Sequence, residues 1–188
     1  MINISKTMQI LSKKYPRSTT TLNSMRGSST PFEILISCLL SLRTRDEVTD
    51  VVSRDLFRVA NTPEKIAKLP ISKLKKIIFK TGHFNKKAET LKSVSKELIK
   101  KFNSKVPDSY DELISIKGVG PKTANIVLAF AFGKLVLPID VHCHRIPNRL
   151  GWIKTKTPEQ TEAELTKILP KKYWRDFNSA FVQFGREI

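Results

Sequence analysis

Residues 116–125 read Ile-Lys-Gly-Val-Gly-Pro-Lys-Thr-Ala-Asn, and they give the strongest indication of the architecture. It is typical of a short helix, a hairpin and a second helix, because Gly118 and Gly120 permit a tight turn and Pro121 favours a first helical position. The second helix, expected over 121–132, is apolar on nearly every side and should be central. The glycines also leave N–H groups beside a positive helix end, which suits an anion, although an ordinary helix turn shows the same pattern.

Helix-start signals recur on both sides of this stretch, whereas alternating strand patterns with hairpin turns are scarce. Thr44 with Glu47 is typical of a capping box, and Asn85 is expected to cap a longer helix that runs to about residue 102. Late aromatic residues at near-helical spacing favour a core stripe over a base-stacking platform. They are Tyr173, Trp174, Phe177, Phe181 and Phe184. The chain is therefore predicted to be all-α.

The charge of the chain points to a polyanionic partner. Lys and Arg total 34 against 17 Asp and Glu, which gives a formal net charge of +17. On charge alone, a basic surface without a specific partner, as in ribosome-associated or membrane-surface proteins, stays open. Cys38 and Cys143 lie far apart in apolar segments, as free thiols do in a reducing cytoplasm. Without a signal peptide or a membrane-length apolar run, a soluble cytoplasmic, nucleoid-associated protein is expected.

Two residues stand out as candidates for chemistry. Lys122 falls in the first turn of the apolar helix, where the helix dipole and partial burial both disfavour an ammonium, as a nucleophile requires. Asp140 follows eighteen positions later, at the expected N-cap of the next helix. The intervening helix rises about 18 Å, and a link of seven residues spans about 23 Å, so the chain can return. The two side chains are therefore expected to face each other, although alone each is more often a solvated lysine or a simple helix cap.

With residues 139–146 (IDVHCHRI) and 148–151 (NRLG), the stretch 118–125 resembles the helix-hairpin-helix and Gly/Pro-Asp signature of the endonuclease III family. The similarity extends to 32–50, where 41–47 (SLRTRDE) is similar to the archaeal branch, and to 82–88 (GHFNKKA). It therefore covers most of the chain, in order. The resemblance implies two α-helical lobes with a DNA-binding cleft between them: a six-helix helix-hairpin-helix domain over 23–134, and a second helical domain over 1–22 plus 135–188.

The resemblance also implies a bifunctional DNA glycosylase and abasic-site lyase of base excision repair that acts as a monomer on double-stranded damaged DNA. Lys122 would attack C1′ of a flipped nucleoside, here an oxidised pyrimidine, and β-elimination would cleave the strand. Asp140 would support the oxocarbenium character of the sugar. Arg43 and His83 would lie in loops that family members insert into DNA. The predicted DNA-binding residues are Arg43, His83, Lys117, Gly118, Val119, Gly120 and Thr123.

Metal ligands are not predicted in this sequence. Family members typically bind a 4Fe–4S cluster through four cysteines after a stretch like 184–188 (FGREI), where the sequence ends. Cys38 and Cys143 cannot replace four ligands, so no cofactor is expected in this chain, which is either cluster-free or truncated. His142, Cys143 and His144 are consecutive and point in different directions on a helix, which makes them a poor site for one ion.

Two other functions fit part of the sequence. One is a monofunctional glycosylase of the mismatch or uracil type; adenine-specific relatives usually carry Tyr at the position of Lys122, so the lysine favours the bifunctional interpretation. The other is a noncatalytic DNA-binding protein that uses the hairpin for phosphates alone, a task that requires neither Lys122 nor Asp140.

Overall fold

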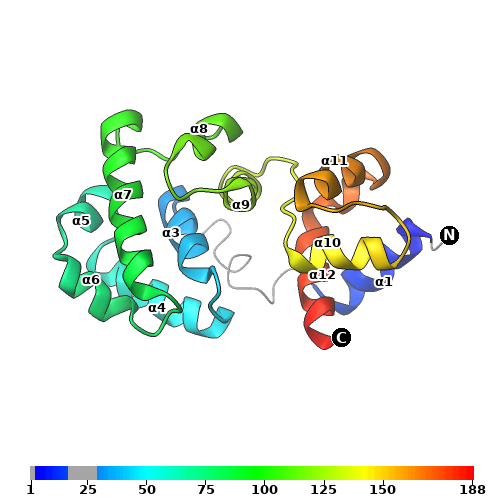
Figure 1. The fold of residues 1–188 in the computed structure, drawn as a ribbon, viewed down its shortest axis with the longest axis horizontal. Helices are drawn as coiled ribbons and strands as arrows, with labels where there is room; N and C mark the ends of the chain where they lie inside the picture. The colour runs from blue at the N-terminus through cyan, green and yellow to red at the C-terminus, as the bar shows by residue number, and fades with distance from the viewer. Residues whose placement is uncertain (1–2, 17–28) are drawn as a thin grey trace.

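The computed structural model describes residues 3–16 and 29–188, and within these residues every regular element is a helix, as predicted. Figure 1 shows two lobes, with α9 viewed almost end-on beside the connection between them. In chain order the elements are α1 (Ile4–Lys14), α3 (Pro31–Ser41), α4 (Asp46–Val59), α5 (Pro63–Lys68), α6 (Ile71–Ile78), α7 (Phe84–Phe102), α8 (Tyr110–Ser115), α9 (Pro121–Ala131), α10 (Val141–Arg149), α11 (Pro158–Ile168), the 3-10 helix η2 (Lys171–Tyr173) and α12 (Trp174–Glu187).

The first lobe is formed by α3 to α9 around one hydrophobic core. Helix α3 packs against α4 and α9, and α7 packs against α5 and α6. The buried face of α7 follows helical spacing, with Ala88, Leu91, Val94 and Leu98 all fully inaccessible. Helix α9 is buried along most of its length, which explains why its sequence is apolar almost all round.

The second lobe is formed by α1, α10, α11 and α12, so the two ends of the chain lie in the same lobe (Figure 1). Helix α12 packs against both α1 and α10. Phe177 and Phe181 are fully buried with ring centroids 4.4 Å apart, so these aromatic residues belong to a core stripe rather than a stacking platform. The predicted boundary between residues 22 and 23 lies outside the described residues.

Two predicted helix starts are wrong, and tertiary contacts explain one of them. Helix α4 begins at Asp46 without a side-chain cap, whereas the Thr44 hydroxyl accepts hydrogen bonds from the Gly82 N–H and the Lys87 amine. Helix α7 begins one residue before Asn85, because His83 takes a left-handed conformation and already accepts the first helical bond. A long-range partner and a backbone turn thus override the local capping signals.

The segment between α9 and α10 sets the position of the second lobe. Gly133 has a φ of 65°, which ends α9, and no regular element follows until Val141. This stretch carries Asp140 back toward the start of α9. Along residues 3–16 and 29–188, none of the helices combines the length and apolar character that a membrane crossing requires.

Candidate active site

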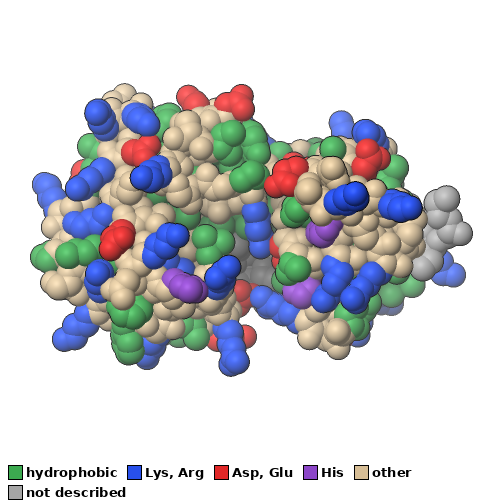
Figure 2. Space-filling view, viewed as in Figure 1, with side chains coloured by type: hydrophobic (Ala, Val, Ile, Leu, Met, Phe, Trp, Pro, Cys, Tyr) green, Lys and Arg blue, Asp and Glu red, His purple; other side chains and the backbone are tan. Residues whose placement is uncertain are grey.

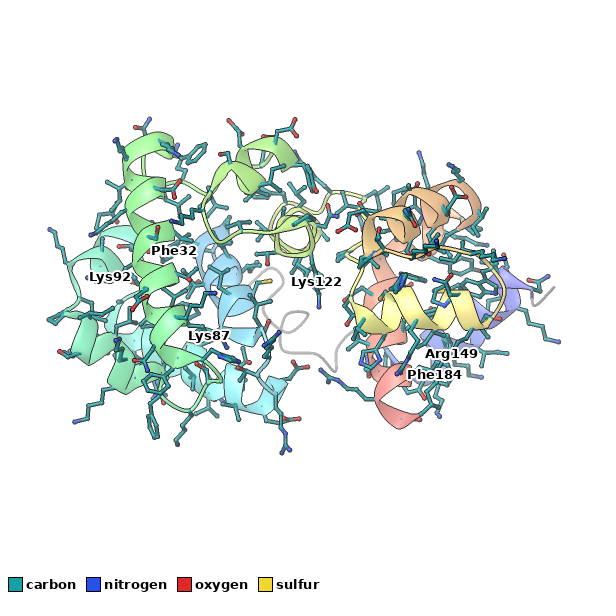
Figure 3. All side chains as sticks on the ribbon, viewed as in Figure 1. Phe32, Lys87, Lys92, Lys122, Arg149 and Phe184 are labelled. Atoms are coloured by element: carbon teal, nitrogen blue, oxygen red, sulfur yellow. The ribbon has the colours of Figure 1, made fainter. Side chains whose placement is uncertain are left out.

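Lys122 lies in the first turn of α9, directly after the hairpin. Pro121 occupies the first helical position and Gly120 is the N-cap, so the local sequence fixes where the lysine leaves the backbone. Its side chain is 43% exposed and extends toward the space between the lobes (Figure 3). The amine is therefore accessible to a ligand while its stem rests on the protein.

Asp140 is the N-cap of α10, as predicted. Its Oδ1 accepts hydrogen bonds from the N–H groups of His142 (2.9 Å) and Cys143 (2.8 Å). Its other oxygen, Oδ2, lies 3.7 Å from Lys122 Nζ, and the carboxylate side chain is only 8% exposed. The starts of α9 and α10 therefore meet in space and place an amine opposite a fixed acid, as the sequence indicated.

A cavity of about 140 Å³ surrounds this pair. Its walls come from both lobes: α9 supplies Ile126 and Phe130, and α12 supplies Asn178, Val182 and Arg186. The loop between α3 and α4 contributes a third wall. Figure 2 shows the hollow between the lobes and basic side chains spread over both lobes on this face. The site is thus open to an anionic ligand that spans the two lobes.

The hairpin before Lys122 has the properties of an anion cradle. Gly118 has a φ of 101°, a conformation that favours glycine. In the described part of the chain, the N–H groups of Gly118 and Gly120 have no hydrogen-bond partner. Both glycines line a groove of about 600 Å³ that also reaches Lys122 and Asp140. Unpaired N–H groups beside the α9 N-terminus can bind a phosphate at this position.

Two of the residues predicted to contact DNA at the hairpin, Val119 and Thr123, are buried in the structure. Val119 is 6% exposed, and its side chain packs in the first core. Its N–H donates to the Ile116 carbonyl (3.0 Å), so the side chain and the N–H both have partners within the protein. Thr123 is 4% exposed, and its side chain faces Cys38, whose pKa burial raises to about 11. Val119 therefore contributes to the core, whereas Thr123 is buried beside Cys38 and also borders the groove of the glycine hairpin.

The remaining predicted DNA contacts are exposed. Lys117 lies exposed at the hairpin, and its N–H donates to Glu97 Oε1 (3.2 Å). Arg43 and His83 are both non-glycine residues in the left-handed region, with φ values of 53° and 56°. Arg43 lines a third hollow of about 500 Å³ together with Arg186, next to the Lys122 cavity.

Several site residues were not predicted. Asn178 donates to the Pro138 carbonyl (2.8 Å) and lines the cavity, and Arg186 forms an ion pair with Asp46 across the lobes (3.0 Å). Arg186 belongs to the family-like stretch 184–188 and so carried a signal. No local pattern marked Asn178, because α12 returns to the site only through the tertiary fold.

A second contact between the lobes also escaped prediction. Asn125 donates from its side-chain amide to both carboxylate oxygens of Glu162 (2.9 and 3.0 Å), which joins α9 to α11. Burial raises the pKa of Glu162, and the amide of Asn125 opposes that rise. The bond lies one turn from Lys122 and so helps to fix α9 relative to the second lobe.

The residues present do not fit a metal cluster. Cys38 is on α3 and packs against α9, whereas Cys143 is buried in the second lobe, so they cannot share a set of four thiolate ligands. His144 Nδ1 is bonded to the Thr161 hydroxyl (2.6 Å), which directs it away from Cys143. Across residues 3–16 and 29–188, no three His, Cys, Asp or Glu side chains converge as metal ligands would.

Known proteins match this chain in sequence and in fold. The family model of the HhH-GPD superfamily base excision DNA repair protein matches residues 36–171. Endonuclease III of Thermotoga maritima is 46% identical over 176 residues, covering 94% of this chain and 79% of the relative. Endonuclease III of Haemophilus influenzae is 35% identical over 188 residues, covering 98% of this chain and 87% of the relative. The archaeal-like character of residues 41–47 stays a prediction.

Solved structures agree with the sequence relatives. A trapped endonuclease III–DNA covalent intermediate has a TM-score of 0.88 at 30% identity, over 100% of this chain and 88% of that one. A thermostable thymine-DNA glycosylase has a TM-score of 0.80 at 25% identity, over 96% of this chain and 83% of that one. The chain therefore belongs to the HhH-GPD superfamily of base excision DNA repair proteins and, within it, to the endonuclease III family.

Proposed function

We propose that Lys122 is the nucleophile and Asp140 the supporting carboxylate of this repair enzyme. As a member of the endonuclease III family, the chain is a bifunctional DNA glycosylase with abasic-site lyase activity. The observation that carries the residue assignment is the 3.7 Å separation of Lys122 Nζ and Asp140 Oδ2 in a cavity between the lobes. Because one chain supplies every wall of the described cavity, a monomer suffices to act on double-stranded DNA.

In the proposed reaction, the unprotonated amine of Lys122 attacks C1′ of a nucleoside turned out of the duplex. The bond between C1′ and the base breaks, and the base leaves with the electron pair. The proton lost by the amine passes through Asp140 Oδ2 to the departing base, so charge balances. The C1′–O4′ bond then breaks, O4′ takes a proton from water, and a protonated Schiff base forms between Lys122 and C1′. Removal of a C2′ proton breaks the C3′–O bond, so the 3′ phosphate leaves with the electron pair and the strand is cleaved.

The hairpin and the surface charge support DNA binding on the same face. Unpaired N–H groups at Gly118 and Gly120 would hold a phosphate close to the reacting sugar. Lys117 and Arg43 add positive charge on either side, consistent with the net charge of +17. We propose an oxidised pyrimidine as the damaged base, the lesion class that the family resemblance implies.

Borohydride trapping on abasic DNA tests the nucleophile. The Lys122→Ala variant should form no trapped complex, and its DNA affinity should stay within a few fold of wild type. Lys134→Ala is a matched control, because Lys134 is also 43% exposed and its Nζ lies 3.6 Å from Asp108 Oδ2, yet it is outside the cavity. An undiminished trap in Lys122→Ala would refute the assignment, and a wild-type chain that releases bases without trapping would be a monofunctional glycosylase.

Asp140→Asn tests the carboxylate without removing the helix cap, because asparagine also accepts the cap hydrogen bonds. Base release in single-turnover experiments should slow by about a hundredfold. Circular dichroism should show an unchanged helical fold. A variant that releases the base at the wild-type rate would exclude the proposed role of Asp140.

A panel of duplexes tests the lesion. It contains oxidised pyrimidines, uracil, mismatched thymine and a bare abasic site. Fastest excision of an oxidised pyrimidine supports the proposed substrate, and preference for uracil or mismatched thymine overturns it.

A further inference from the structure

Lys87 is a buried lysine, and a contribution to the stability of the fold does not explain why a charged side chain occupies this position. It lies on α7 and is only 8% exposed, yet in the described part of the chain no carboxylate lies within ion-pair distance of its amine. Instead, Nζ donates to the Leu40 carbonyl (2.6 Å) and the Thr44 hydroxyl (2.7 Å). A buried ammonium without a counter-charge costs stability relative to an apolar side chain, so the two bonds indicate a role other than stabilising the fold.

The two bonds anchor the loop between α3 and α4. The Leu40 carbonyl belongs to the last turn of α3, where carbonyls lack helical partners. Thr44 lies in the loop, and its hydroxyl also accepts from the Gly82 N–H (3.2 Å) in the turn before α7. One lysine and one threonine therefore tie this loop to the α6–α7 turn.

The loop and the turn also touch backbone to backbone. A Cβ added to Gly82 would lie 2.7 Å from the Arg43 carbonyl oxygen, closer than real Cβ contacts allow. Each segment carries one non-glycine residue in the left-handed region, Arg43 on the loop and His83 on the turn. Such conformations are strained in non-glycine residues and persist only where the surroundings impose them. Lys87 is part of what imposes them.

The anchored loop borders every hollow of the site described above. Leu42 lines the groove of the glycine hairpin, and Thr44 lines the cavity of Lys122 and Asp140. Arg43 lines the third hollow with Arg186. Figure 3 shows Lys87 on the side of α7 near this loop, well away from Lys122. The amine therefore acts on the rim of the site and does not touch the reacting atoms.

We infer that Lys87 is a positioning residue that fixes the Arg43 and His83 tips as a rigid rim for turning a nucleotide out of the duplex toward Lys122. The inference rests on the proposed function, since only an enzyme that extracts a nucleotide needs such a rim. A mobile rim would lose conformational entropy each time it became ordered on DNA, and this cost would slow the extraction of the nucleotide. Once a sugar is outside the stack, the rim is no longer required.

The Lys87→Met variant tests the inference, because methionine fills the space of the stem without the cation or the donors. Single-turnover excision of an oxidised pyrimidine from a duplex should slow about tenfold or more, by the loss of two charge-assisted bonds. Schiff-base trapping on an abasic site placed in an unpaired bulge, already outside the stack, should stay within about twofold. An unchanged duplex rate, or an equal loss on both substrates, overturns the inference. Failure of the proposed function is read separately, because it would appear as an undiminished trap in Lys122→Ala or as an absent trap in wild type, whatever Lys87→Met does.

Lys92 provides a matched control on the same helix. Its Nζ donates to the Ala67 carbonyl (2.6 Å), a bond of the same kind, but it points toward α5 and not toward the site (Figure 3). Lys92→Met should leave both rates within about twofold of wild type. In a double-mutant cycle, adding Thr44→Val to Lys87→Met should slow the duplex reaction by less than the product of the single effects. Independent effects would show that Lys87 does not act through Thr44.

Discussion

Gly118→Ala is the substitution that most directly tests how the hairpin is built. Gly118 has a φ of 101°, and an added Cβ would lie 2.7 Å from the Thr90 Cγ2 methyl group on α7. Thr90 is half-buried and its hydroxyl is bonded to the Lys86 carbonyl (3.0 Å), so the methyl group has little freedom to move aside. The methyl group of alanine therefore meets both a backbone and a steric obstacle.

The two obstacles can be given separate magnitudes. An alanine held at this φ costs about 1–3 kcal/mol. Overlap with a packed methyl group costs about 1–3 kcal/mol more. The sum, about 2–6 kcal/mol, lies mostly below the stability of a typical domain, about 5–15 kcal/mol, so the variant should fold but be clearly destabilised. Thr90→Ser removes the methyl group and keeps the hydroxyl. Adding it to Gly118→Ala should therefore recover the stability lost to steric overlap, but not the stability lost to the backbone conformation.

Urea titration and DNA binding measured side by side separate folding from function. Gly120→Ala is the matched control, since its φ of −96° suits alanine and an added Cβ meets nothing within 4 Å. Its free energy of unfolding should change by less than about 0.5 kcal/mol. Its DNA affinity should still fall, because the methyl group projects into the groove where a phosphate would approach. Wild-type stability of Gly118→Ala would refute the strain argument, and wild-type affinity of Gly120→Ala would refute the phosphate cradle.

Three further predictions concern charge. DNA affinity should fall steeply with salt, and Lys117→Gln should reduce the slope of log Kd against log salt by about one; an identical slope would exclude a phosphate contact at Lys117. Burial lowers the pKa of Lys87 from 10.5 to about 8, so the folded state loses this proton before the unfolded chain does. As the pH rises from about 8 to about 10.5, the free energy of unfolding of wild type, measured by urea titration, should increase by about 1–3 kcal/mol relative to that of Lys87→Met. The same pH dependence in both proteins would contradict this prediction. Asn125→Leu leaves the half-buried Glu162 carboxylate unpaired and should cost about 1–3 kcal/mol at neutral pH. Because the pKa of Glu162 is already raised, this loss should shrink as pH falls toward 4.5 and the carboxyl becomes protonated; a loss independent of pH would point to packing instead.

The sequence was informative wherever structure depends on neighbouring residues. The hairpin follows from Gly118 and Gly120, and the position of Asp140 follows from its role as a helix cap, which needs only the next three residues. The meeting of Lys122 and Asp140 also followed, because the lengths of one helix and one link limit where the chain can return. These features are set within about twenty-five residues.

Features that depend on contacts between distant segments were not predictable in the same way. Thr44 has the pattern of a helix cap, but its hydroxyl is used by Gly82 and Lys87, about forty positions away. Val119 was assigned to DNA contact by motif alone, and the core occupies its side chain. In each case a buried tertiary partner competes with a local or surface role, and the sequence shows only one side of that competition.

The active site exists only while the two lobes stay docked, because each lobe supplies one of the two residues proposed for chemistry. Lys122 belongs to the helix that closes the first core, and Asp140 begins the first helix of the second. Two side-chain contacts bridge the lobes beside this pair, Asn125 with Glu162 and Asp46 with Arg186. An exposed ion pair such as the second contributes little, about 0–1 kcal/mol, whereas the partly buried amide–carboxylate bond is worth more. The docking of the lobes therefore depends more on Asn125 than on the ion pair. The Asn125→Leu variant should form less Schiff base at urea concentrations where both cores are still folded.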